Sequence, residues 1–273
     1  MAGQPAWTEA SPRMISLYTF TMGRSFYLHR FLRAIVRAGA THAGRVEHHL
    51  CCQGVDLDPE ALAITRDSGL PNLRFEVHRW PENIGLQAGI NRIVPQLQGD
   101  LIVKIDDDCL ILSDDFFDHV RAVARLEPRA TFSPYPVGLI GTPGGPAALD
   151  RHVRYSAETD TYYTFRRVDH VGGLCRISPA SLVREWRLEP GRSVDVRNED
   201  TQMSRLCREN GIAMFYLENA LVVEHQESTL GQEARYQEYF AKRLAQAPPR
   251  LPRLREGVRA VRRSLARMLP PRR

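Results

Sequence analysis

Two groups of carboxylates and one histidine are the residues of this chain whose types and spacing could do chemistry. The first group, Asp106, Asp107 and Asp108, directly follows a short apolar segment at residues 101–105. Three adjacent carboxylates repel one another, so a cation is needed to stabilise them, and oxygen ligands favour Mg²⁺ or Mn²⁺. The alternative is a solvated acidic turn that caps the next segment. An apolar strand that runs directly into the triplet favours the metal site.

The second group is Glu199-Asp200, which follows a polar stretch at residues 192–198 and opens an amphipathic helix. Acidic residues in a first helical turn usually interact with the helix dipole, so a structural role is the alternative. His225 follows an apolar run at residues 221–223. A single histidine at a strand end is more often structural than a ligand, so each feature is weak without the others.

The first hundred residues alternate between strand and helix patterns, which would bring these groups to one place. Pro95 should kink or shorten the third helix. Such alternation predicts a parallel sheet with helices on both faces, and these sheets bind ligands at the carboxyl edge of the strands, where the acidic triplet lies. The expected strands are residues 14–19, 49–53, 73–77 and 101–105, and the expected helices are residues 25–38, closed by Gly39, 58–69, capped by Asp58, and 86–97.

The second half is less regular. Ser113 is expected to cap a helix that carries Phe116 and Phe117 and stops before Pro128, and residues 134–150 are rich in Gly and Pro, which predicts a loop. The remaining expected elements are a strand over 162–174, a short helix from 178, a helix over 199–210 and two short strands within 212–224.

Charge is concentrated at the C-terminus. The 273-residue chain has a formal net charge of +5, yet residues 250–273 contain nine arginines and one acidic residue, which leaves a slightly acidic body. We therefore expect no nucleic-acid partner for the folded body. Five cysteines without a CxxC pair predict neither a disulfide framework nor a zinc site. With no signal peptide or membrane-spanning pattern, we expect a cytoplasmic protein.

The basic tail has apolar residues at helical spacing among its arginines, from Leu254 to Leu269. This pattern is typical of a helix that lies on an anionic membrane, here the inner face of the cell membrane. Docking onto the body and a disordered solubilising tail are the alternatives. We expect a leader at residues 1–13, a catalytic domain at 14–228 and a helical extension at 229–273.

A series of short motifs follows one another along the chain: Tyr18 to Arg24, Asn83-Ile84-Gly85 with Asn91, Asp106-Asp107-Asp108, Val171-Gly172-Gly173, Glu199-Asp200 and His225. In this order, the motifs resemble those of glycosyltransferase family 2 enzymes of the GT-A fold, over about residues 14–226. The resemblance implies an α/β fold with a Rossmann-like, mostly parallel sheet. It also implies an inverting, metal-dependent transferase that moves a sugar from a nucleoside diphosphate to an acceptor hydroxyl, in the synthesis of bacterial surface glycans or glycolipids.

The resemblance also implies roles for the matching residues. Asp200, with Glu199 beside it, would be the general base for the acceptor. Asp108 and His225 would bind Mn²⁺ or Mg²⁺, with Asp106 as a further ligand. The acceptor would be a glycan or lipid-linked. The residues implied in binding the nucleotide sugar are Thr21, Arg24, Gln53, Asn83, Gly85, Asn91, Asp106, Asp107, Gly172 and Gly173.

Two positions depart from the family pattern. Cys52-Gln53-Gly54 replaces the acidic pair that commonly reads the base, and Ile90 precedes Asn91 where an arginine is often found. The base of the donor therefore stays open. The alternatives are a nucleotidyltransferase, although the chain offers only Gly23 and Arg24 for a phosphate loop, a nonenzymatic binder of nucleic acid or membrane through the tail, and an inactive relative.

Overall fold

The computed structural model describes residues 14–137, 149–189 and 199–226. The predicted leader, most of the predicted loop at 134–150 and the predicted basic tail lie outside the described residues. None of the helices within these three ranges is long and apolar enough to cross a lipid bilayer.

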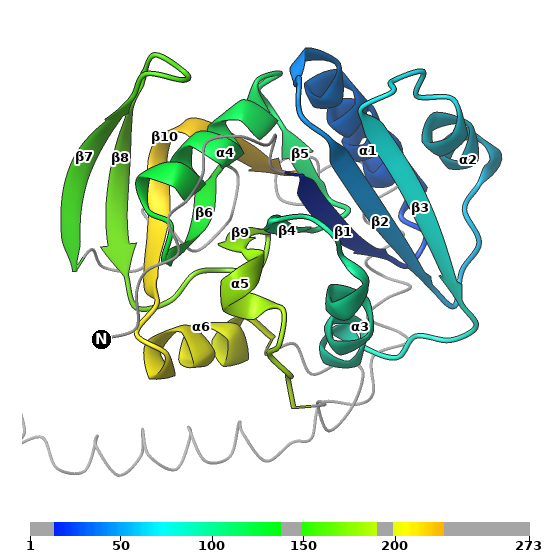
Figure 1. The fold of residues 1–273 in the computed structure, drawn as a ribbon. Helices are drawn as coiled ribbons and strands as arrows, with labels where there is room; N and C mark the ends of the chain where they lie inside the picture. Colours follow the sequence, from blue (N-terminus) through cyan, green and yellow to red (C-terminus); the bar gives the residue numbers. More distant parts are fainter. Residues whose placement is uncertain (1–13, 138–148, 190–198, 227–273) are drawn as a thin grey trace, which may run out of the picture. The chain divides into compact units, whose positions relative to one another are not determined.

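The described residues form a mixed sheet with helices on both faces (Figure 1). The strands are β1 (Ile15–Thr21), β2 (Val46–Gln53), β3 (Leu73–Trp80), β4 (Leu101–Ile105), β5 (Cys109–Ile111), β6 (Ala130–Val137), β7 (Asp150–Ser156), β8 (Thr161–Val168), β9 (Cys175–Pro179) and β10 (Ala213–His225). The helices are α1 (Ser25–Thr41), α2 (Pro59–Arg66), α3 (Leu86–Ile93), the 3₁₀ turn η1 (Val94–Gln96), α4 (Phe116–Leu126), α5 (Ala180–Val183) and α6 (Glu199–Glu209).

The order of the strands is β3-β2-β1-β4-β9-β6-β10-β8-β7, with β5 paired to β10. Strands β3, β2, β1 and β4 are parallel, as predicted. β9 enters antiparallel beside β4, with Ile105 opposite Cys175. The end of β4 and the start of β9 therefore meet at one edge, together with the end of β1.

Side chains that alternate along β1 face two separate cores. Ile15 and Leu17 are fully buried among residues of α1 and α4. Tyr18 and Phe20 pack instead with residues of α3, α5 and α6. Because successive side chains of a strand point to opposite faces, an apolar strand of this kind must be covered on both sides. β1 and β4 are therefore packed on both faces, up to the sheet edge at which the two strands end.

Several boundaries differ from the sequence predictions. α1 continues past Gly39 to Thr41, because Gly39 serves close packing: an added Cβ would lie 3.0 Å from Leu73 Cδ2. Asp115, not Ser113, precedes α4. α3 ends at Ile93 and passes into η1, as expected from Pro95.

Part of the predicted loop at 134–150 is strand, since β6 extends to Val137 and β7 begins at Asp150. In the ranges the structure describes, β6 pairs with β9 at Phe132, so Pro134 and Pro136 interrupt no ladder on that side. β8 ends at Val168 instead of 174. β10 is one long strand with a register shift between Leu217 and Val222, where two short strands were expected.

Candidate active site

The ends of β1 and β4 bring Thr21, Arg24 and the acidic triplet together. Tyr18 lies opposite Lys104 in the parallel ladder, so the residues that follow each strand emerge side by side. Thr21 Oγ1 donates a hydrogen bond to Asp107 Oδ2 at 2.8 Å and accepts one from the Gly23 N–H. Gly23 has φ +81°, a conformation that glycine adopts without strain and that turns the chain into α1.

Arg24 is the counter-ion of the triplet. Its Nη1 donates to Asp108 Oδ2 at 2.6 Å, and its Nη2 forms an ion pair with Asp107. The side chains of Asp107 and Asp108 are only 1% and 6% exposed. Burial raises the pKa of Asp107, and Arg24 opposes that rise. A single guanidinium thus pairs with two nearly buried carboxylates.

His225, the last residue of β10, lies beside Asp108. His225 pairs with Cys109 of β5, and the Gln226 N–H donates to the Asp108 carbonyl at 2.8 Å. His225 Nε2 lies 3.8 Å from Asp108 Oδ2. Burial lowers the pKa of His225, although Asp108 acts to raise it. The imidazole and the carboxylate therefore lie side by side, and their predicted role as metal ligands stays a prediction.

Asp106 is joined to Asp200 through two intervening residues. Lys104 Nζ donates to Asp106 Oδ1 at 2.6 Å and also to the carbonyl of Gly173. Gly173, just before β9, packs against the side chain of Asp200 at the start of α6. A Cβ at residue 173 would lie 2.7 Å from Asp200 Cγ, so a larger residue there would displace the Asp200 side chain. Asp106 and Asp200, far apart in the sequence, are thus linked through Lys104 and Gly173.

A cavity of about 210 Å³ of empty space opens beside Asp200. Burial alone would lower the pKa of Lys104, but Asp106, Asp200 and Glu199 together raise it. Lys104 is therefore a permanent buried cation between the acidic groups. The residues that line the cavity are Tyr18, Ile90, Lys104, Gly173, Arg176, Glu199, Asp200 and Met203. Asp108 and His225 do not line this cavity. Asp108 lies instead between Arg24 and His225.

Lys104 and Arg176 were missed as site residues from sequence. Each is a charged residue inside an apolar strand and is no more than 6% exposed. Arg176 donates to the Val171 carbonyl at 2.7 Å and so braces the segment that leads to Gly172 and Gly173. Their position inside a buried strand could have marked them in the sequence, because a buried cation needs a charged or polar partner.

The turn at residues 83–85 is held by its own neighbours. Gln53 Oε1 accepts from the Ile84 N–H at 3.1 Å, and Asn83 Oδ1 accepts from the Gly85 N–H at 2.9 Å. Gly85 has φ +79°, which explains the glycine. Gln53 is 3% exposed. These contacts give the turn a structural basis, and its contact with a nucleotide sugar stays a prediction.

Asn91 has a structural partner. Its Nδ2 donates to the Leu188 carbonyl and its Oδ1 accepts from the Leu188 N–H, both at 2.7 Å. The amide thereby fixes the segment after α5 against α3. Its predicted role at the nucleotide sugar is not supported by these contacts and stays a prediction.

We expect Asp106→Asn to stabilise the protein increasingly as pH rises. Burial first, and then Asp108 and Asp200, raise the pKa of Asp106 to about 7, although Lys104 opposes this. A raised native pKa means that the folded state holds a proton which the unfolded state releases near pH 4, so the wild type loses stability between about pH 4 and 7. Asn carries no such proton.

The measurement is the Tm of both proteins from pH 5 to 8 in chelator. The variant's Tm minus that of the wild type should become more positive by ~2–4 °C for each kcal/mol gained. A difference that is flat or falls with pH would contradict the raised pKa.

The fold and this edge site define a protein of the GT-A class. The sequence matches the glycosyltransferase-like family 2 over residues 12–238, and the chain belongs to that family. No match was found among curated proteins. The family resemblance predicted from the motifs is thereby confirmed.

Solved glycosyltransferase structures share the fold. Staphylococcus aureus TarS 1-349 in complex with UDP-GlcNAc has a TM-score of 0.56 and 14% identity, over 79% of this chain and 61% of that one. GalNAc-T7 with UDP, GalNAc and Mn²⁺ has a TM-score of 0.55 and 13% identity, over 78% and 43%. The mannosyltransferase PcManGT from Pyrobaculum calidifontis, in complex with GDP-Man and Mn²⁺, has a TM-score of 0.55 and 14% identity, over 88% and 67%. The chain spans 36–61% of the length of the TarS structures that it matches.

Proposed function

We propose that this protein transfers a sugar from a nucleoside diphosphate to an acceptor hydroxyl, with inversion at the anomeric carbon. The observation that carries the proposal is the link from Asp106 through Lys104 and Gly173 to Asp200. It sets a carboxylate for the acceptor beside a cluster suited to the donor. Family membership supports the same chemistry.

Asp200 acts as the general base. As the acceptor oxygen attacks the anomeric carbon, its proton passes to the Asp200 carboxylate, and the bond from that carbon to the diphosphate oxygen breaks. A single displacement inverts the centre. General-base catalysis of this kind contributes ~10²- to 10⁴-fold. Lys104, fixed by Asp106 and Gly173, holds positive charge beside the reacting groups.

Asp108 and His225 fit a divalent cation. A carboxylate oxygen and a neutral imidazole, 3.8 Å apart, are donors that Mn²⁺ accepts, and Mg²⁺ accepts the carboxylate. When bound, such an ion would act as a Lewis acid that neutralises the diphosphate leaving group. Mn²⁺ in the GalNAc-T7 and PcManGT structures supports this proposal. Asp106 is a further candidate ligand; its Oδ1 is bound by Lys104, as Asp108 Oδ2 is bound by Arg24, so a cation would compete with a basic side chain at either carboxylate.

A panel of UDP-, GDP- and dTDP-sugars with Mn²⁺ tests the donor. The base stays open because Gln53, in place of an acidic residue, is engaged with Ile84. A ligand at 100 times its Kd stabilises the native state by ~2.7 kcal/mol, which should raise Tm by ~5 °C or more. No shift with any donor, with or without Mn²⁺, would contradict the proposal.

Gly173→Ala should lower kcat by ~100-fold without loss of folding, since displacement of a catalytic group by about 1 Å costs roughly that much. The new methyl group would overlap the Asp200 carboxylate. Glu209→Gln is the control, because Glu209 lies in the same helix as Asp200 and its side chain is 58% exposed. Equal activity of the two variants, measured as initial rates of transfer, would argue against Asp200 as base.

For the acceptor, we propose a bacterial surface glycan or a lipid-linked glycan, with the protein in the cytoplasm and peripheral on the membrane. The support is the sequence of residues 250–273, with nine arginines around an apolar stripe. Co-sedimentation with anionic liposomes, with and without these residues, tests this part. Equal binding by both forms would exclude the tail as the anchor.

A further inference from the structure

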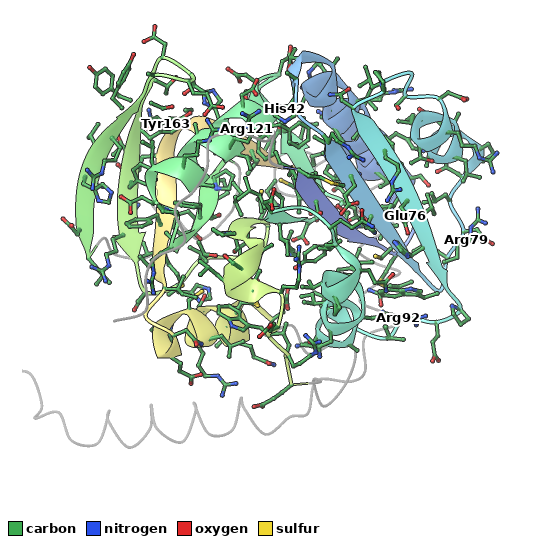
Figure 2. All side chains as sticks on the ribbon, in the orientation of Figure 1. His42, Glu76, Arg79, Arg92, Arg121 and Tyr163 are labelled. Carbon is green, nitrogen blue, oxygen red and sulfur yellow. The ribbon has the colours of Figure 1, made fainter. Side chains whose placement is uncertain are left out.

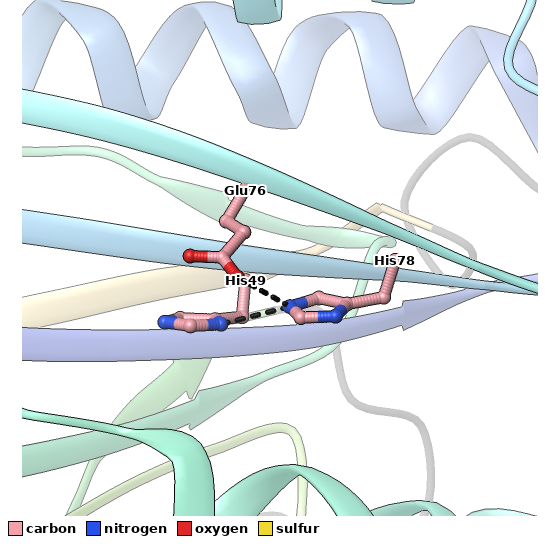
Figure 3. A group of neighbouring side chains, drawn as sticks. All are labelled: His49, Glu76 and His78. Atoms are coloured by element: carbon pink, nitrogen blue, oxygen red, sulfur yellow. Dashed lines mark hydrogen bonds and ion pairs between the residues drawn. The ribbon is translucent and has the colours of Figure 1, made fainter.

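A group of metal-ligand side chains lies on β2 and β3, apart from the residues of the candidate active site. His49 comes from β2, and Glu76 and His78 come from β3 (Figure 3). His49 lies opposite Glu76 in the ladder, and Glu76 and His78, two residues apart, share one face. One ligand atom from each lies within 4.8 Å of the other two.

The nitrogens of the two imidazoles face each other. His49 Nδ1 lies 2.9 Å from His78 Nε2, and the ring planes are 13° apart. Glu76 Oε1 lies 3.8 Å from the same His78 Nε2. Two nitrogens bound to a tetrahedral Zn²⁺ lie roughly 3.3 Å apart, so the pair must open by only a few tenths of an ångström. The side chain of His78 is 15% exposed, so it is the more accessible of the two histidines.

A buried carboxylate orients the inner histidine. Glu47, fully buried, has its Oε1 3.5 Å from His49 Nε2. The same Oε1 accepts hydrogen bonds from the Ser16 hydroxyl and from the Gln98 N–H. A carboxylate oxygen beside Nε2 favours the tautomer with the proton on that nitrogen. Nδ1 then keeps its lone pair toward His78, the arrangement that metal-binding histidines use.

The outer ligand is also partly fixed. Arg74 Nη2 lies 3.2 Å from Glu76 Oε2 and 3.5 Å from Glu47 Oε2. The other oxygen of Glu76 is the one that faces His78. Glu76 is on the β3 side of the molecule, where β3 is the edge strand (Figure 2).

We propose that His49, Glu76 and His78 bind one Zn²⁺ that joins β3 to β2, with a fourth position open to water. Two imidazoles and one carboxylate are an established zinc ligand set, and imidazole ligands favour Zn²⁺ over Mg²⁺ or Mn²⁺. Bound between two strands, the ion holds the edge strand in register.

Equilibrium dialysis of chelator-stripped, full-length protein against Zn²⁺ tests the proposal, with visible absorption of the Co²⁺ form as a report on four-coordinate geometry. We expect one site per chain that survives Asp108→Asn and is lost in Glu76→Gln. Loss of a carboxylate that merely orients a ligand costs ~10- to 100-fold in affinity, and loss of Glu76 itself should cost at least as much. The Glu76 side chain is 43% exposed, so this variant should fold.

His152→Gln is the matched control, since His152 Nε2 lies 3.0 Å from Glu127 Oε1 and forms a histidine–carboxylate pair elsewhere on the sheet. It should leave zinc binding unchanged. Zinc that is lost with Asp108→Asn but kept in Glu76→Gln would assign the ion to the candidate active site and overturn the proposal. Absence of stoichiometric zinc would leave His49 and His78 as a hydrogen-bonded pair and overturn it equally.

Discussion

Asp200→Asn should abolish sugar transfer while it leaves donor binding intact. The amide has the shape of the carboxylate, so it still fits against Gly173, but it cannot take the acceptor's proton. Loss of a general base costs ~10²- to 10⁴-fold in rate. We expect kcat to fall by that factor with the donor KM nearly unchanged.

The measurement combines initial rates with donor-induced shifts in Tm. Glu209→Gln is the matched control, because Glu209 lies in the same helix, α6, and is 58% exposed. It should behave as the wild type in both assays. Transfer by Asp200→Asn at near the wild-type rate would show that another group accepts the proton.

Asp108→Ala should remove the dependence of activity on Mn²⁺ and leave only background transfer. Asp108 is the carboxylate shared by Arg24 and His225, at 2.6 Å and 3.8 Å. Without it, the imidazole alone cannot hold a hard cation against a diphosphate. Removal of one preorganised electrostatic group typically costs ~10²- to 10³-fold in kcat.

The measurement is a Mn²⁺ titration of initial rates after removal of metal with chelator. Asp114→Asn is the control, since Asp114 is 56% exposed and pairs with Arg37 away from the edge site. Wild-type activity in chelator would show that Arg24, the cation already on Asp108, suffices for charge neutralisation. The metal assignment would then be wrong.

The first half of the fold was predictable because its strands are parallel, and β1 and β4 are buried on both faces. In such strands the apolar run itself marks the element, and β1 to β4 lie close to their predicted positions. The second half depends on partners that the sequence does not display. Residues 134–137 of β6 were predicted as part of a loop because of Pro134 and Pro136, yet both prolines lie in the ladder with β10, opposite Leu217 and Val223.

Asp108 and His225 were predicted from the family motifs to bind one metal ion; the two side chains lie 3.8 Å apart, and their role as ligands stays a prediction. The link through Lys104 was not predictable, because it depends on the Gly173 carbonyl facing the same ammonium as Asp106. The direction in which a backbone carbonyl points cannot be read from a sequence motif. For the same reason Asn91 could not be recognised as a clamp on the Leu188 backbone.

The position of Lys104 has one further consequence, for the way in which the two proposed substrates affect each other's binding. Its ammonium divides its attraction between Asp106 and the carbonyl beside which Asp200 rests. A phosphate group that arrives near Asp106 competes for the same ammonium and so changes the electric field at Asp200. Under the proposed function, occupancy of the donor side would then alter affinity for the acceptor by the factor with which the acceptor alters affinity for the donor, since such coupling is reciprocal. We therefore expect binding of the two substrates to be coupled.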